Sequence, residues 1–154
     1  MAEIDRPYPM PRAFHFKVEF QGINGITDHD VKFQDVSGLS AEVGTEELKE
    51  GGENRFTHRL PTRAKYNNLV LKRGMLTDSG LIKWFVDAVE NFIFKPVTIT
   101  VKLLDGEHEP LVTWSFINAY PVKWSVNDLK ATENAVVIES IELAYQYFRR
   151  ISFP

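Results

Sequence analysis

Residues 36–61 read VSGLSAEVGTEELKEGGENRFTHRLP, and this stretch predicts a long β-hairpin. Gly51 and Gly52 lie between polar residues, and glycine adopts the positive φ angles that a tight reversal needs. After the turn, Phe56, His58 and Leu60 alternate with polar residues, as side chains on the two faces of a strand do. We therefore expect a hairpin over about residues 41–60.

The two arms of this predicted hairpin carry opposite charge. The glutamates of the first arm are Glu42, Glu46, Glu47, Glu50 and Glu53, against a single Lys49. No acidic residue lies between Asn54 and Thr77, where the basic residues are Arg55, Arg59, Arg63, Lys65, Lys72 and Arg73. Cross-strand pairs inside the hairpin would satisfy this separation of charge. Contact between the acidic arm of one copy and the basic tract of the next would satisfy it equally well.

The composition favours one globular domain. A chain of 154 residues with 44% hydrophobic content normally forms a single core, so we expect one domain over residues 1–154. The formal charge of −3 argues against specific nucleic-acid recognition, which usually needs a basic domain or stripe. The absence of cysteine excludes disulfides and thiolate chemistry. No apolar run is long enough to predict a membrane span, and the first residues do not form a secretory signal.

The pattern outside the hairpin predicts a mainly β fold, an antiparallel sandwich or barrel with one packed helix. Alternating prolines predict an extended N-terminal arm over residues 1–12. We expect strands over residues 14–20, 31–36, 69–74, 97–103, 111–118, 122–126 and 135–150, and a connection over residues 61–68. The alternation changes phase in the last strand, which predicts a β-bulge near Glu139 and Ser140.

One helix is predicted over about residues 79–91, with Asp78 as the residue that caps its first turn. Its apolar face is formed by Leu81, Trp84, Phe85, Ala88 and Val89, at the spacing of one helix face. The residues that we expect in the core are Phe16, Val18, Trp84, Phe85, Val101, Trp114, Ile141 and Leu143.

The sequence offers little for catalysis or for a cofactor. Asp28-His29-Asp30 is the one metal-like triplet, but its side chains alternate in an extended segment, so a solvated loop is the favoured interpretation. Phosphate-binding glycine motifs and a nucleophile elbow are missing from the sequence. Phe56 and Tyr66 could stack on bases, although aromatic residues in strands more often pack in a core. We therefore expect that the protein is not an enzyme and that it has no cofactor and no metal site.

Short motifs spread along the chain resemble the tail-tube proteins of contractile phage tails and of related contractile injection systems. The matching pieces are Phe14-x-Phe16-x-Val18, Val36-Ser37-Gly38-Leu39, Glu50-Gly51-Gly52, Leu60-Pro61, Leu69-x-Leu71-Lys72-Arg73-Gly74, Trp84-Phe85, Trp114-x-Phe116-x-Asn118-Ala119-Tyr120-Pro121-x-Lys123 and Glu139-x-Ile141-x-Leu143-Ala144. Thr62 and Asn67 depart from the family pattern, which often has glycine there. Residues 145–148, Tyr-Gln-Tyr-Phe, are more similar to the injection-system branch.

This resemblance implies a structural subunit that forms hexameric rings, and the rings stack into a hollow conduit driven through a target envelope by a contracting sheath. It implies sheath, baseplate or spike, and tube-cap proteins as partners, with protein cargo in the lumen. The candidate contacts between subunits or rings are Glu46, Glu47, Glu50, Gly51, Gly52, Glu53, Asn54, Arg55, Arg59, Arg63 and Lys65. Two alternative sets of lumen-lining residues remain open, either Thr98, Thr100 and Lys102 or Ser140, Glu142 and Gln146.

Three other functions remain open from the sequence. A relative of the tube protein could start or end the tube at the baseplate, or form a secreted ring that carries effectors. A monomeric β-barrel that binds a small ligand in an apolar cavity belongs to a different class. For a tube protein we expect synthesis in the bacterial cytoplasm without a signal peptide, and action in an assembled particle that is a virion, an extracellular injection system or a cell-anchored one.

Overall fold

The computed structural model describes residues 15–26, 32–52, 54–76, 79–132 and 136–151. The predicted arm over residues 1–12 and the triplet Asp28-His29-Asp30 lie outside these ranges. The described elements are β1 (His15–Gln21), β2 (Asp35–Ser37), β3 (Ala41–Leu48), β4 (His58–Tyr66), β5 (Leu69–Gly74), α1 (Gly80–Glu90), β6 (Val97–Leu104), β7 (Pro110–Val126), β8 (Ile138–Ala144) and β9 (Tyr147–Ile151). The prediction of a mainly β, antiparallel fold with one helix is confirmed.

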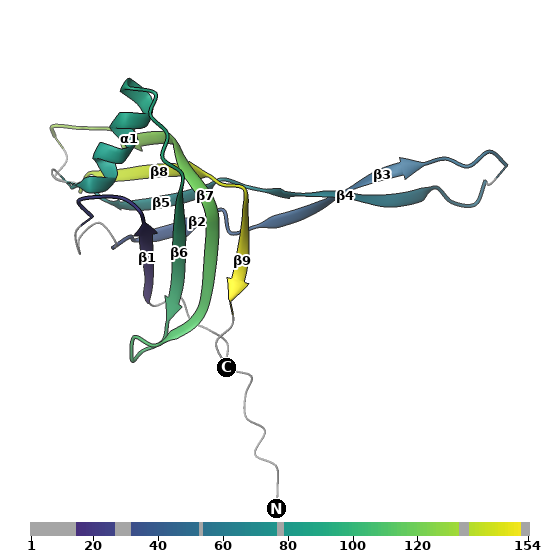
Figure 1. The fold of residues 1–154 in the computed structure, drawn as a ribbon, viewed down its shortest axis with the longest axis horizontal. Coiled ribbons are helices and arrows are strands. Elements are labelled where there is room, and N and C mark those ends of the chain that lie inside the picture. The colour runs from purple at the N-terminus through teal and green to yellow at the C-terminus, as the bar shows by residue number, and fades with distance from the viewer. Residues whose placement is uncertain (1–14, 27–31, 53, 77–78, 133–135, 152–154) are drawn as a thin grey trace, which may run out of the picture.

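The strands form a two-layered body from which one hairpin extends (Figure 1). The first layer has the order β1-β6-β7-β9, and the second layer has the order β7-β8-β5-β2. β7 belongs to both layers, because its first part pairs with β6 and β9 and its last part pairs with β8. Asn118 has a φ of 52° at the point where the register between β6 and β7 shifts, and this irregularity bends β7 from one layer into the other.

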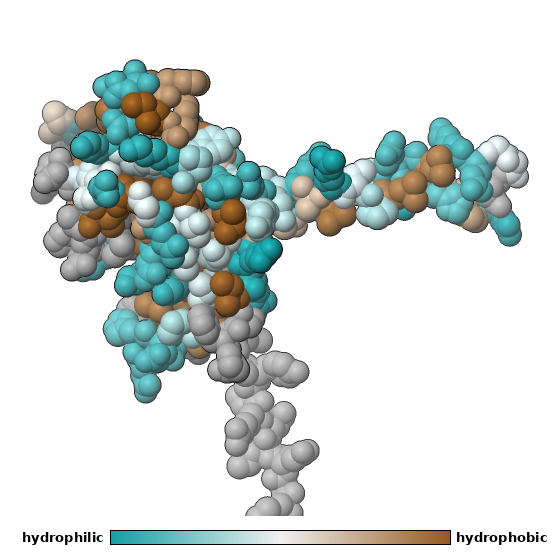
Figure 2. Space-filling model, viewed as in Figure 1, coloured by the Kyte–Doolittle hydropathy of each residue, from teal (hydrophilic) through white to brown (hydrophobic). Residues whose placement is uncertain are grey.

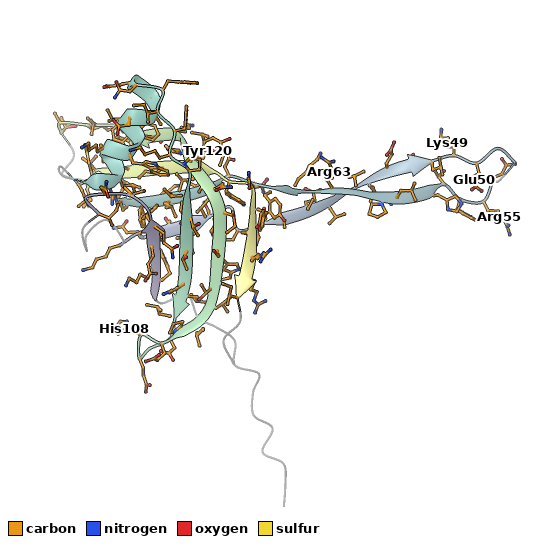
Figure 3. The ribbon with its side chains drawn as sticks, viewed as in Figure 1. Lys49, Glu50, Arg55, Arg63, His108 and Tyr120 are labelled. Carbon is orange, nitrogen blue, oxygen red and sulfur yellow. The ribbon has the colours of Figure 1, made fainter. Side chains whose placement is uncertain are left out.

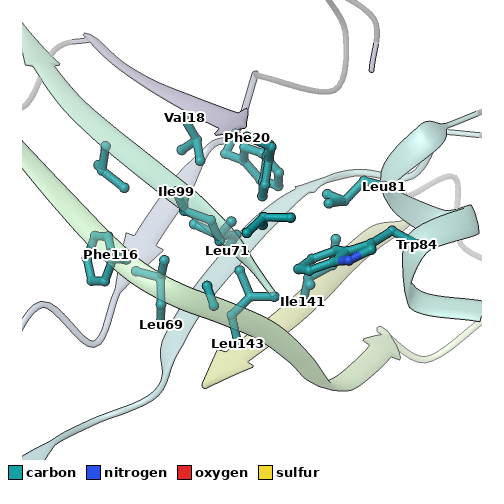
Figure 4. Close-up of a cluster of buried hydrophobic side chains, with 14 residues drawn as sticks. Val18, Phe20, Leu69, Leu71, Leu81, Trp84, Ile99, Phe116, Ile141 and Leu143 are labelled. Carbon is teal, nitrogen blue, oxygen red and sulfur yellow. The ribbon is translucent and has the colours of Figure 1, made fainter. Parts of the chain in front are cut away.

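The core lies between the two layers and below α1. It contains Val18, Phe20, Phe33, Leu69, Leu71, Leu81, Trp84, Val97, Ile99, Val101, Phe116, Ala119, Ile141 and Leu143. Figure 4 shows Leu81 and Trp84 of the helix pointing into the same cluster as Ile141 of β8. Helix and sheets therefore share one core.

The structure places most of the predicted core residues in or against this cluster. Val18, Trp84, Val101, Ile141 and Leu143 are buried, while Phe16 and Trp114 are partly buried and pack against them.

Phe85, which the sequence predicts in the core, lies outside the buried cluster. It lies at the margin of the helix contact, where its ring centroid is 6.4 Å from that of Trp124. Leu81, Trp84 and Ala88 are the residues of α1 that are buried, whereas Val89 is exposed. The buried stripe of the helix is therefore narrower than the sequence pattern predicts.

Ser79 caps α1, in place of the predicted Asp78. Its side chain accepts hydrogen bonds from the amides of Leu81 and Ile82, at 3.2 and 3.4 Å. The same hydroxyl accepts a hydrogen bond of 2.9 Å from Nη2 of Arg73 on β5. The start of the helix is thereby fixed to the second layer.

A buried ion pair replaces the bulge that the sequence predicts near Glu139 and Ser140. β8 pairs with β5 in unbroken register, so Glu139 faces the core together with Ile141. Arg73, opposite it on β5, forms the ion pair through its Nε, and Nε1 of Trp124 donates to the other carboxylate oxygen at 3.2 Å. Arg73 and Glu139 are 2% and 0% exposed. The change of phase in the sequence pattern therefore marks a charged residue, Glu139, at a core position, where the charge of Arg73 balances it.

Four strand boundaries also differ from the prediction. The strand expected over residues 31–36 is β2, which begins only at Asp35 and ends at Ser37. β4 continues through Pro61 to Tyr66, because a two-stranded ribbon leaves one side of each strand unpaired and tolerates a missing amide. β7 continues through Pro121, which lies at a register shift against β8. The last strand is divided at residues 145–146, where the chain leaves β8 in the second layer and enters β9 in the first.

Candidate assembly surfaces

The β3–β4 hairpin extends from the body, and none of its strand residues is buried (Figures 1 and 2). Its large apolar side chains, Val43, Leu48, Phe56 and Leu60, are 46–60% exposed. An isolated two-stranded hairpin is marginally stable in water, because it has no core of its own. The hairpin therefore presents an apolar and charged surface that this chain does not cover.

The register of the hairpin determines which side chains share a face. Leu48 lies opposite His58 and Glu46 opposite Leu60, so Leu48 and Leu60 share one face in the outer half of the hairpin. The register shifts between Val43 and Thr45. A Cβ on the intervening Gly44 would lie 2.5 Å from Oγ1 of Thr62, so a larger residue there would require the exposed Thr62 side chain to change rotamer. Phe56 follows the turn, next to this apolar face, with its ring centroid 4.9 Å from that of His58.

The structure gathers the predicted contact residues on this one hairpin. Glu47 lies directly opposite Arg59, and Glu42 lies opposite Lys65. Among the described residues, however, neither of these opposed pairs forms an ion pair within 4.0 Å. A described contact within the hairpin places Nε2 of His58 3.5 Å from Oε2 of Glu50, and it is an ion pair only when the imidazole is protonated. The register therefore supports charge pairing between β3 and β4, but the ion pairs that this interpretation predicts at Glu47–Arg59 and Glu42–Lys65 are not formed between these described residues.

The remaining predicted contact residues also lie in the exposed hairpin. These are Glu46, Gly51, Gly52, Asn54, Arg55, Arg63 and Lys65, while Glu53 lies outside the described residues. Figure 3 shows Lys49, Glu50 and Arg55 near the tip and Arg63 closer to the body. Charges of both signs are therefore distributed along the whole projection.

Residues at the base of the hairpin, which the sequence did not single out as a group, fix it to the body. The hydroxyl of Tyr145 donates to the carbonyl of Asn67 at 2.6 Å, and Nδ2 of Asn68 donates to Glu142 at 2.9 Å. Tyr66 packs against Tyr145 and Phe148, with ring centroids 5.9 and 5.3 Å away. This packing gives Tyr66 a structural contact in place of the base-stacking role considered from the sequence.

Gly38 sets the direction in which the chain enters the hairpin. Its φ is +88°, and a Cβ at this position would lie 2.0 Å from the carbonyl oxygen of Asn68. Only glycine accepts both the backbone conformation and the close approach. The amide of Ser40 then donates to the Gly38 carbonyl at 2.8 Å, and Nδ2 of Asn67 donates to Oγ of Ser40 at 2.6 Å. The hairpin therefore leaves the body in a defined direction.

The first layer ends in two strands that are each paired on one side among the described residues. β1 pairs with β6, and β9 pairs with β7. Unpaired strand edges expose backbone amides and carbonyls that can pair with another chain. The outer strand of the second layer, β2, has three residues, so it offers a shorter edge than β1 with seven or β9 with five.

The outer face of the first layer is polar. Thr98, Thr100 and Lys102 occupy the positions of β6 that alternate with core residues Val97, Ile99 and Val101; Thr98 and Lys102 are partly exposed, whereas Thr100 is only 9% exposed. Glu19 of β1 accepts from both Lys17 and Lys102, with nitrogen–oxygen distances of 3.3 and 3.2 Å. Burial alone would raise the pKa of Glu19, but the hydrogen bonds and charges of these two lysines outweigh it and lower the pKa below its usual value.

The second set of lumen candidates lies in a different layer. Ser140 and Glu142 of β8 alternate with buried Glu139, Ile141 and Leu143 and face outwards from the second layer. Gln146 lies between β8 and β9, where its Oε1 accepts from Nδ2 of Asn118 at 2.9 Å. The two candidate sets therefore belong to two separate surfaces.

The described residues contain no cluster of three or more His, Asp or Glu side chains arranged for a metal ion. Within the same residues, α1 is too short to cross a membrane.

Comparisons with known proteins place the fold. The family model of the T4-like virus tail tube protein gp19 matches residues 12–149. A chain in the baseplate of the anti-feeding prophage is 32% identical, with 89% of this chain and 91% of that chain aligned and a TM-score of 0.77. Comparison with curated protein sequences gave no match.

Two further solved structures share the fold at lower identity. A chain of the tube-terminating cap of the anti-feeding prophage is 23% identical, with a TM-score of 0.79 over 99% of this chain and 97% of that chain. A chain of the PVC sheath–tube complex, from an extracellular contractile injection system in the extended state, is 24% identical, with a TM-score of 0.75 over 97% and 95% of the two chains. Since the family model spans residues 12–149 and the 32%-identical relative aligns over most of its length, this chain belongs to the T4-like virus tail tube protein gp19 family.

Proposed function

We propose that this chain is the repeating subunit of the inner tube of a contractile injection system, in which six copies form a ring and rings stack into a hollow conduit. The observation that carries the proposal is the hairpin, which projects from the body with none of its strand residues buried. A projection with exposed apolar side chains on a soluble protein indicates a surface made for contact. Membership of the tail tube family supports a second copy as its partner.

The edges of the first layer supply a way to close the ring. When β9 of one copy lies beside β1 of the next, the backbone groups of both edges pair, and the layer continues from subunit to subunit. Closure of such a sheet into a barrel of many strands leaves an aqueous channel.

The same arrangement selects one of the two candidate lumen surfaces. The layer that continues around the ring presents its polar outer face to the channel, so Thr98, Thr100 and Lys102 line the lumen together with Lys17 and Glu19. Ser140 and Glu142, on the second layer, then face away from it. A polar inner wall remains wetted and offers no large apolar surface to which a passing protein could adhere.

In this function the chain is structural and catalyses no reaction. The sheath, the baseplate and the tube cap are its proposed partners, since the similar chains come from a sheath–tube complex, a baseplate and a terminating cap. Protein cargo would occupy the lumen, and the particle would act outside the cytoplasm in which the subunit is made.

Size-exclusion chromatography followed by negative-stain microscopy tests the proposal. We expect rings or rods of uniform bore. A clean monomer at all concentrations would contradict the tube function and favour a ligand-binding module, although the space between the layers holds packed side chains such as Val18, Ile99 and Phe116.

Charge reversal identifies where the hairpin charges act. We expect both the triple variant Glu46→Lys, Glu47→Lys, Glu50→Lys and the triple variant Arg59→Glu, Arg63→Glu, Lys65→Glu to lose assembly. If the contact is between copies, a mixture of the two variant proteins regains assembly. If the pairs are internal, assembly returns only when all six changes are made in one chain, and the proposed contact between copies is then wrong.

A second candidate is a baseplate-proximal tube relative that forms one ring at the start of the tube. It is favoured by the baseplate chain, which is more similar to this sequence than the sheath–tube chain is, at 32% against 24% identity. Microscopy separates the two candidates, because a repeated subunit elongates into rods alone, whereas a tube-initiating ring remains a single ring.

A further inference from the structure

The outer face of the first layer carries an excess of positive charge. Figure 1 shows its four strands side by side, and their register gives the side chains that share this face, because opposed residues of neighbouring strands point to the same side. The charged members of the face among the described side chains are Lys17, Glu19, Lys102 and Arg149. Each copy therefore presents three cations and one carboxylate here, whereas the whole chain has a formal charge of −3.

Two of these cations lie in an arrangement that the stability of the sheet does not explain. Lys17 and Lys102 are directly opposite each other in the register of β1 and β6, and like charges in this position destabilise a strand pair. Glu19 contacts both, with its carboxylate 3.3 Å from Nζ of Lys17 and 3.2 Å from Nζ of Lys102. One carboxylate balances the charge of only one lysine, so one positive charge remains in excess.

Arg149 adds a second excess charge at the other edge of the face. It belongs to the same row of the sheet as Glu19, Thr100 and Ser115, but two strands separate it from Glu19. Its guanidinium lies over the ring of Tyr147, with Cζ 5.4 Å from the ring centroid. Among the described residues no carboxylate forms an ion pair with Arg149, so its charge is available to a ligand.

Acidic residues follow β6, but they lie beyond one end of this face. Asp105, Glu107 and Glu109 belong to the turn that joins β6 to β7, and Figure 3 shows His108 of the same turn at the far end of the two strands. Oδ1 of Asp105 accepts from the amides of Glu107 and Glu109, at 2.8 and 2.9 Å, so this carboxylate stabilises the turn. Between its two ends the face is cationic.

We propose that this cationic face, as the wall of the lumen, holds an acidic polypeptide. This rests on the proposed tube function and names the kind of cargo that the lumen retains. A single contact between an exposed cation and a carboxylate is weak, but each copy in a ring and each ring in a stack repeats it, so many weak contacts act together. Because none of them is strong alone and salt screens them all, the cargo is retained without being fixed to the wall.

The chemistry of the face favours a polypeptide over a nucleic acid, the other common biological polyanion. Proteins that bind single-stranded nucleic acid without sequence preference combine a basic groove with aromatic side chains on which the bases stack. Tyr147 is the aromatic residue of this face among the described side chains, and the guanidinium of Arg149 already lies over its ring. Aspartate and glutamate side chains need only cations, which Lys17, Lys102 and Arg149 provide.

Retention of labelled probes by assembled tubes tests the proposal. The full chain is assembled in the presence of a glutamate-rich peptide, a lysine-rich peptide of equal length or oligothymidylate, and the tubes are sedimented and washed at low salt. We expect about tenfold more of the glutamate-rich peptide than of the lysine-rich peptide to be retained, and high salt to release it. Equal retention of the two peptides would overturn the proposal. Stronger retention of oligothymidylate than of the glutamate-rich peptide would also overturn it, in favour of a nucleic acid.

Two matched variants locate the binding. Lys102→Gln with Arg149→Gln removes two positive charges from the proposed wall, and we expect the preference for the glutamate-rich peptide to disappear. Lys72→Gln with Lys123→Gln removes the same charge from exposed positions opposite Ser140 and Glu142, on the outer face of the second layer, and we expect the preference to remain. Equal losses from both variants would show that the peptide binds outside the lumen, against the proposal.

The outcomes separate this proposal from the tube function. If the parent forms tubes that retain no glutamate-rich peptide, the wall does not hold acidic cargo and the tube function stands. If the parent forms no rings or tubes, both proposals are wrong. If the wall variant does not assemble, the comparison of the probes on parent tubes decides, with Lys72→Gln, Lys123→Gln as the control for the outer surface.

Discussion

The body and the hairpin are built from the same kind of strand and differ in what covers them. In β5 every second residue is buried, and Leu69, Leu71 and Arg73 all face the core. The outer half of the hairpin also carries apolar side chains at alternate positions, but Leu48 and Leu60 remain exposed. Alternation therefore shows that a strand has two different faces. Whether the apolar face is covered by the same chain or by another molecule depends on where the strand lies.

Removal of the outer hairpin gives the largest expected effect. Replacing residues 45–61 by Asn-Gly joins the remaining arms with a tight turn. Assembly, measured by sedimentation and microscopy, should be abolished. The free energy of unfolding should change by less than about 1 kcal/mol, since no strand residue of the hairpin is buried. A loss of several kcal/mol in urea unfolding would show that the hairpin belongs to the cooperative body.

Glu139→Gln tests the buried body, the region that the hairpin is compared with. Arg73 would keep its charge in the core without a carboxylate to balance it, so we expect a loss of about 3–5 kcal/mol in urea unfolding. The double variant Arg73→Met, Glu139→Leu removes both charges and should recover much of this loss. In the hairpin, Glu47→Gln is the matched control, and we expect it to change stability by less than about 0.5 kcal/mol. Equal effects at the two positions would contradict the difference in burial.

Phe92→Gly should stabilise the isolated subunit by about 0.5–1 kcal/mol, because glycine relieves the left-handed backbone at a cost in unfolded-state entropy. Thermal unfolding of unassembled protein measures this change. Asn91→Gly, at a position with a φ of −102°, is the control and should destabilise the subunit. A destabilising Phe92→Gly would mean that the exposed ring supports the body after all.

The smallest expected effect concerns Glu19 and pH. Its pKa is lower in the folded state than the unfolded value of about 4.3, so its contribution is complete above that pH and is lost as the pH falls through the folded pKa. Because the carboxylate is partly exposed and screened, we expect only a few tenths of a kcal/mol. Comparing urea midpoints of the parent and Glu19→Gln at about pH 7 and about pH 3 measures it. The difference between the two proteins should shrink at the lower pH.

The local sequence pattern predicted the helix and strands better than it predicted what surrounds each residue in the folded protein. The hairpin, the helix and the antiparallel β character all follow from residue types and spacing, and the structure confirms them. The pattern predicted a bulge near Glu139 that the structure does not have. A charged residue on a core face interrupts the apolar alternation, and the sequence does not show that Arg73 lies opposite it. It also divided β7 at Pro121, since the sequence does not show which amides of a strand lack a partner.

By itself the sequence determined that a hairpin forms over about residues 41–60 and that its arms differ in charge, because glycine conformation and side-chain chemistry are local properties. Only the tertiary structure decided that the hairpin leaves the body uncovered and that the two lumen candidates lie in different layers. Only it brought Phe92, Phe94 and Tyr120 together. These properties depend on contacts between residues far apart in the chain, and such contacts are fixed when the layers pack and β7 bends from one into the other.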